Sequence, residues 1–140
     1  MDGSAPRAVL DTNVLVSGVL FDGAPATLLE PARSGLVHGV TSLYILEEFQ
    51  AVLQRPKFEI DPSLAQTLAL QIAAFNEVLP LEESTKRWWT DPADDPVIET
   101  ALVGGAAYLV TGDKELLQVE LAGLEVVTVA EMLEILGLKT

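Results

Sequence analysis

The sequence contains no cysteine, and this absence removes several kinds of chemistry. Disulfide bonds, thiolate nucleophiles and cysteine-ligated zinc sites are all excluded. The single histidine, His38, argues against Ser-His-Asp hydrolysis and against zinc sites built from several histidines. We interpret His38 as structural, because it precedes Gly39-Val40-Thr41, where a strand is expected to begin. Carboxylate chemistry is what remains to this chain.

Basic residues are also scarce. Eight Lys and Arg stand against 21 Asp and Glu, which gives a formal net charge of −13. Such a balance disfavours non-specific binding to nucleic acid, because phosphate backbones attract a positive surface. It favours instead a basic protein partner.

Long apolar runs are missing as well. No run approaches the roughly 20 residues needed to cross a bilayer. The first seven residues are small and acidic with no basic start, so we expect no signal peptide and a cytoplasmic protein without membrane association. A length of 140 residues with 49% hydrophobic residues predicts a single folded domain over residues 1–140.

Short apolar segments alternate with helical patterns along the chain. Strands are expected at residues 7–10, 36–41, 78–81 (at a sheet edge), 108–111 and 124–128. Helices are expected at residues 25–34, 43–53, from 61–63 to about 75, 96–103, 114–119 and 129–136. Residues 14–20 continue apolar without an assigned element, and residues 82–95 are expected to form a surface loop. The alternation predicts the α/β class, as a three-layer α/β/α sandwich with a central parallel sheet.

The first apolar strand ends abruptly in Asp11-Thr12-Asn13. In a parallel sheet, residues after the carboxyl end of a strand face the ligand crevice. Asp113 follows the 108–111 strand by two residues, with Gly112 allowing the backbone to turn, so both acids are expected at the same edge. An ionised carboxylate at such a buried position is costly unless a positive charge meets it.

Two further acids can reach this edge. In the 43–53 helix, Glu48 falls at the border of the apolar stripe, whereas Glu47 falls almost opposite it and is expected in solvent. Asp95 stands where the 96–103 helix begins. Each acid also has a plain structural explanation: Asp95 and Asp113 are suitable helix caps, and an isolated glutamate is usually a surface residue. The conjunction of four acids is what suggests a site.

A divalent metal explains such a cluster. Carboxylates gathered within a few ångströms repel one another or take up protons. Hard cations such as Mg²⁺ or Mn²⁺ favour carboxylate oxygen and water as ligands. A metal held in this way can polarise a phosphoryl oxygen and supply an activated water for attack on a phosphodiester.

Four motifs, taken in order, resemble the PIN-domain family, and most closely its VapC-like toxins of toxin–antitoxin pairs. They are Val9-Leu10-Asp11-Thr12-Asn13, the helix from Ser42 through Glu48-Phe49, Asp91-Pro92-Ala93-Asp94-Asp95, and Val110-Thr111-Gly112-Asp113. The resemblance runs from about residue 7 to 136. It implies a PIN-like fold and a Mg²⁺- or Mn²⁺-dependent endoribonuclease, often homodimeric, with an RNA substrate and an antitoxin partner.

The resemblance also implies roles for single residues. The acidic quartet of the family, catalytic and metal-binding, falls on Asp11, Glu48, Asp95 and Asp113. Asn13 and Thr111 match positions that support the metal or its waters, and Asp94 is an alternative to Asp95. The RNA target, the number of metals and the antitoxin are left open.

Substrate-binding candidates are few in so acidic a chain. Lys86, Arg87 and Lys114 are candidates for contacts with phosphate groups. Lys86-Arg87-Trp88-Trp89 would make a basic and stacking surface for single-stranded RNA, although such a Trp pair more often serves packing.

Two other functions compete with the nuclease. A phosphatase of the haloacid-dehalogenase type also begins with an Asp after its first strand, but it needs a second Asp two residues later, where this chain has Asn13. Its later Gly-Asp-x-x-x-Asp pattern also fails, at Leu117. The other alternative is a non-catalytic PIN-like domain that only binds a partner, and intact acids at all four positions argue against it.

Overall fold

A five-stranded parallel sheet forms the centre of the computed structural model, which describes residues 5–82 and 95–138. The strands are β1 (Arg7–Leu10), β2 (His38–Ser42), β3 (Asn76–Leu79), β4 (Tyr108–Val110) and β5 (Glu125–Val127). Their order across the sheet is β3-β2-β1-β4-β5. The first strand therefore lies in the middle, with Val9 opposite Val40 on one side and Leu109 on the other.

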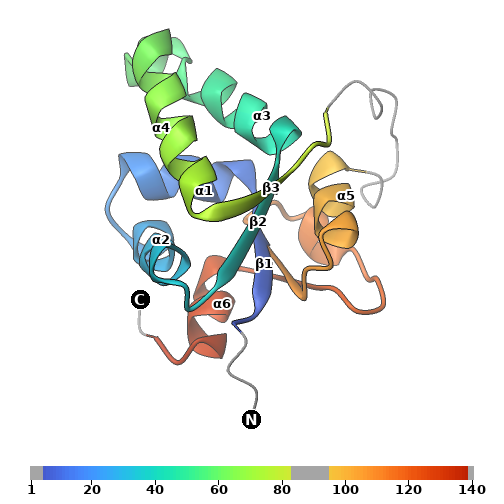
Figure 1. The fold of residues 1–140 in the computed structure, drawn as a ribbon. Coiled ribbons are helices and arrows are strands. Elements are labelled where there is room, and N and C mark those ends of the chain that lie inside the picture. Colours follow the sequence, from blue (N-terminus) through green and yellow to red (C-terminus); the bar gives the residue numbers. More distant parts are fainter. Residues whose placement is uncertain (1–4, 83–94, 139–140) are drawn as a thin grey trace.

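Helices cover both faces of the sheet, as Figure 1 shows. They are α1 (Thr12–Leu20), α2 (Ala24–Ser34), α3 (Leu43–Leu53), α4 (Pro62–Ala74), α5 (Pro96–Val103) and α6 (Val129–Ile135), with short 3₁₀ helices at Pro56–Phe58 and Leu116–Gln118. Helix α5 lies on one side of the strands, and α1, α3 and α4 gather on the other. The predicted three-layer α/β/α architecture is confirmed.

Helix α1 is the element that the sequence pattern did not predict. It starts directly after Asp11, whose carboxylate caps it, and covers the residues that had no assigned element. Thr12, Val14, Leu15 and Val16 are all buried, so the helix shows almost no polar side in its first turn. A helix buried on most sides lacks the periodic polar stripe by which helices are recognised.

The other expected elements differ from the structure mainly at their ends. Strand β2 extends to Ser42, which also caps α3 through a hydrogen bond from the backbone N–H of Ile45. Strand β3 lies at the predicted edge but begins at Asn76, so Pro80 follows it directly. The helix expected at 114–119 is a single 3₁₀ turn. The loop expected at 82–95 falls almost entirely outside the described residues.

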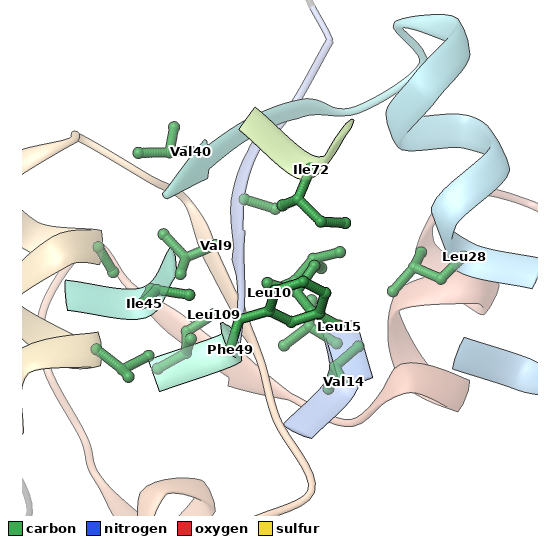
Figure 2. Close-up of a cluster of buried hydrophobic side chains, with 14 of the residues drawn as sticks. Val9, Leu10, Val14, Leu15, Leu28, Val40, Ile45, Phe49, Ile72 and Leu109 are labelled. Atoms are coloured by element: carbon green, nitrogen blue, oxygen red, sulfur yellow. The ribbon is translucent and has the colours of Figure 1, made fainter. Parts of the chain in front are cut away.

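Phe49 of α3 belongs to the cluster of buried apolar side chains shown in Figure 2. Its ring is 0% exposed, and Leu15 of α1 and Ile72 of α4 are each 1% exposed. These residues come from three different helices, so the core fixes α1, α3 and α4 together under β1 and β2. Those attachments hold in place the sheet edge at which Asp11 lies.

Within the described residues, no single helix is long and apolar enough to cross a membrane. Helices α1 and α2 pass that test only as a pair, and they are bent by 100° at the break between them.

Candidate active site

Asp11 and Thr111 lie side by side because β1 and β4 end together. Leu10 pairs with Val110 in the parallel register, and the backbone N–H of Asp11 donates to the Val110 carbonyl at 2.9 Å. After each of these two strands the backbone leaves the sheet at the same edge. In parallel sheets this edge, at the carboxyl ends of the strands, is where ligands bind.

The Asp11 carboxylate is buried, at 6% exposure, and both of its oxygens accept hydrogen bonds. Oδ1 accepts from the backbone N–H of Thr12 at 2.7 Å, and Oδ2 accepts from the Thr111 hydroxyl at 2.6 Å. The pKa of Asp11 is nevertheless raised to about 6, mainly by burial and to a smaller extent by the charges of Asp95 and Glu48, against the lowering effect of the two hydrogen bonds. Desolvation and like charge thus outweigh the donors.

Glu48 reaches the site through Thr12. The Thr12 hydroxyl donates to Oε1 of Glu48 at 2.5 Å. Glu48 is half-buried on α3 whereas its neighbour Glu47 is exposed, as their angular positions on the helix predicted. One threonine therefore connects the two acids, with its backbone on Asp11 and its hydroxyl on Glu48.

Asp113 joins the same network by its backbone. Its N–H donates to the Thr111 hydroxyl oxygen at 3.0 Å, and that hydroxyl in turn donates to Asp11. The Asp113 side chain is exposed, and its Oδ1 accepts from the backbone N–H of Glu115 at 2.8 Å. Asp113 is thus both a turn cap and a neighbour of the buried acid.

Asp95 caps α5, accepting from the backbone N–H of Val97 at 2.8 Å. The plain structural role expected for it is therefore present. Its pKa is raised, first by burial and then by the charges of Glu48 and Asp113, against the hydrogen bond from Val97. Asp95 also raises the pKa of Asp11, so the cap lies within electrostatic reach of the other three acids.

The donor chemistry of this cluster fits a hard divalent cation, because every candidate ligand is a carboxylate. Among residues 5–82 and 95–138, no three acidic or histidine side chains converge closely enough to share one ion. Mg²⁺ is commonly held by one or two carboxylates, with waters and substrate phosphates completing the shell. The arrangement is compatible with a site of that open kind. No ion pair among the described residues neutralises any of the four acids.

Other predicted site residues are not brought into the cluster. Asn13 is exposed, and within the described part of the chain its side chain makes no hydrogen bond. Lys114 is exposed too and lacks an ion-pair partner among the described residues. Lys86, Arg87 and Asp94 lie outside the described residues, together with Trp88 and Trp89.

Thr12 is the contact residue that sequence reasoning missed. Its role depends on the helix that starts there, which turns its hydroxyl toward α3. The sequence signal for this contact is the pair Asp11-Thr12. Asp11 is a suitable helix cap, and Thr12 would then be the first residue of a helix, whereas the pattern indicates the end of a strand followed by a loop.

Comparisons with known proteins bear on the fold and on the family of the chain. None of the curated proteins searched matches the sequence. A chain of VapBC2 from Rickettsia felis, solved bound to a DNA fragment from its promoter, is similar in fold, with a TM-score of 0.58 at 18% identity. The match covers 87% of this chain and 98% of that one. A family model described as "PIN domain" matches residues 7–115, which span β1 through Asp113. The chain belongs to the PIN-domain family.

Proposed function

We propose that this protein is a Mg²⁺- or Mn²⁺-dependent endoribonuclease, with Asp11, Glu48, Asp95 and Asp113 as its catalytic and metal-binding acids. The observation that carries the proposal is one continuous set of hydrogen bonds. It runs from the N–H of Asp113 through Thr111 to Asp11, and through Thr12 to Glu48. Residues that lie 100 positions apart are thus held as a unit around a buried carboxylate.

The chain's own residues have separable roles in this proposal. Asp11 and Glu48 supply carboxylate oxygens whose positions are fixed by the donors Thr12 and Thr111. Asp95 and Asp113 add negative charge beside them. A bound divalent ion would supply a Lewis acid and an activated water for hydrolysis of a phosphodiester. Without it, four acids would repel both one another and the phosphate.

The test is cleavage of a labelled single-stranded RNA in Mg²⁺ or Mn²⁺, with and without chelator. We expect cleavage by the wild type that chelator abolishes, and none by Asp11→Asn, whose fold is checked by circular dichroism. Cleavage by the variant at the wild-type rate would refute the assignment. Hydrolysis of a small phosphomonoester without RNA cleavage would favour the phosphatase, but the family match over 7–115 argues against that outcome.

We also propose that the protein is the toxin of a toxin–antitoxin pair, homodimeric and cytoplasmic. The similar fold of a chain of VapBC2 supports the proposal. The formal net charge of −13 also supports it, because an acidic toxin complements a basic antitoxin segment. Co-expression with a candidate antitoxin encoded by an adjacent gene should yield a complex that loses RNA cleavage. Recovery of the toxin alone would contradict the pairing.

A further inference from the structure

Two buried hydroxyl groups meet between the start of α3 and the middle of α5. Ser42 ends β2 and caps α3, and Thr100 lies in the middle of α5. Both residues are 0% exposed, and their hydroxyl oxygens are 2.9 Å apart across 58 positions of sequence. Buried hydroxyls are costly unless paired, so this contact is a specific feature of the interior.

The hydrogens can be assigned, because each hydroxyl has only one. The Thr100 hydroxyl lies 2.8 Å from the Pro96 carbonyl, which can only accept, so Thr100 donates there. Ser42 then donates to Thr100 and accepts from the backbone N–H of Ile45 at 3.3 Å. A single chain of hydrogen bonds thus runs from the first turn of α3 to the first turn of α5.

Each end of this chain lies close to an acid of the cluster. Pro96 is the first residue of α5, next to its cap Asp95. Ile45 lies one turn before Glu48 on α3. The charge of Glu48 already acts on Asp95, although the two acids belong to different helices. The hydrogen-bond chain therefore joins the start of the helix that carries Glu48 to the start of the helix that Asp95 caps.

We propose that Ser42 and Thr100 are positioning residues that hold Asp95 at the distance from Glu48 which a divalent cation requires. This inference rests on the proposed metal-dependent function, and it adds two residues that carry no charge and touch no substrate. Groups that support metal ligands from outside the coordination shell commonly change the affinity of the site for the metal by roughly 10–100-fold when they are removed. Ser42 and Thr100 act on the metal affinity through the orientation of α3 relative to α5.

The test measures Mn²⁺ binding by electron paramagnetic resonance, without RNA. Thr100→Val keeps the β-branched shape but removes the hydroxyl, and it should weaken Mn²⁺ binding by roughly tenfold. Thr100→Ser restores the hydroxyl and should bind within about twofold of the wild type. The matched control is Thr67→Val, which removes an exposed hydroxyl that also donates to a carbonyl four residues earlier, that of Ser63 in α4. It should bind Mn²⁺ as the wild type does.

A further variant separates positioning from folding. Thr100→Val leaves the Ser42 hydroxyl buried without its acceptor. Ser42→Ala/Thr100→Val removes both hydroxyls, at the cost of the α3 cap on the N–H of Ile45, so its fold is checked by circular dichroism. We expect this double variant to melt cooperatively and still bind Mn²⁺ weakly. Wild-type affinity in the folded double variant, or in Thr100→Val, would overturn the inference and leave the proposed function intact. Mn²⁺ binding without RNA cleavage by the wild type would refute the function but not the positioning, and no Mn²⁺ binding by the wild type would overturn both.

Discussion

The Thr111 hydroxyl donates to Oδ2 of Asp11 at 2.6 Å, joining residues 100 positions apart in sequence. The bond exists because β1 and β4 are neighbours with the same direction, so both residues leave the sheet at one edge. It is also the largest of the influences that lower the pKa of Asp11 against its burial. The charge on the central acid of the site therefore depends on a neutral side chain from the far part of the chain.

Replacing Thr111 with Val should raise the pKa of Asp11 above its present value of about 6, because the lowering hydrogen bond is lost. If ionised Asp11 is needed for cleavage, the acid side of the pH–rate profile should move to higher pH by on the order of one unit. Thr111→Ser keeps the hydroxyl and should keep the profile. An unchanged profile in Thr111→Val would show that this bond does not control the acid.

The metal-free protein should lose stability as the pH rises from about 4 to about 6. The folded-state pKa of Asp11, about 6, lies above its ordinary value of 3.8, so the folded state binds the proton more tightly. Its contribution is fully present below pH 4 and is lost as the pH passes the folded pKa, at most about 3 kcal/mol. The raised pKa of Asp95 acts in the same direction.

Denaturant melts across this pH range, with chelator present, measure the effect. Asp11→Asn removes the titrating group and should flatten the curve, leaving the variant more stable than the wild type at pH 7. If the stability of the wild type between pH 4 and 6 changed no more than that of the variant, the raised pKa would be contradicted.

Glu48→Gln and Glu47→Gln form a matched pair on adjacent positions of α3. Glu48 is half-buried and bonded to the Thr12 hydroxyl, whereas Glu47 is exposed. We expect Glu48→Gln to lower RNA cleavage on the order of 100-fold, and Glu47→Gln to change it less than about twofold. Single-turnover cleavage rates at saturating Mn²⁺ provide the comparison. Equal losses would indicate a general effect of helix charge.

Metal addition should raise the melting temperature of the wild type. A ligand at 100 times its dissociation constant stabilises the state that binds it by about 2.7 kcal/mol. Asp95→Asn should reduce the shift, because it removes one carboxylate of the cluster while Asn still caps α5. Differential scanning fluorimetry in Mn²⁺ against Ca²⁺ and chelator measures this. The same shift in the variant would exclude Asp95 as a contributor.

Phe49→Ala should destabilise the protein by about 3–5 kcal/mol, because it empties a fully buried position in the core. Leu70→Ala on α4 is the control, since its side chain is 64% exposed and should cost less than about 0.5 kcal/mol. Urea unfolding gives both values. Similar losses in the two variants would show that the core is arranged differently.

The sheet could be predicted because its strands are short apolar segments bounded by turn residues, and strand–helix alternation fixes a parallel order. Helix α1 could not, because Val14, Leu15 and Val16 are buried together and leave no period to detect. The edge position of β3 was foreseen from Pro80, yet its start at Asn76 depends on pairing with Gly39, which sequence does not display.

For the site, the position of Asp11 and Asp113 after the carboxyl ends of two parallel strands predicted that both lie at the same edge of the sheet. The difference between Glu47 and Glu48 followed from helix periodicity. The link between Ser42 and Thr100 could not be foreseen, because each hydroxyl acquires the other as its partner only from tertiary packing. Asn13, which the resemblance singled out, is exposed, and its supporting role stays a prediction.

The central place of β1 in the sheet has a consequence for biosynthesis. The first strand to leave the ribosome is the middle strand of the sheet, and its partner β4 is made about 100 residues later. Until Thr111 and Asp113 have emerged, Asp11 has neither its hydroxyl donor nor the turn beyond it. A nascent chain that stops before Thr111 therefore carries no assembled acidic cluster, because Asp11 lacks the contacts that β4 and the turn after it supply.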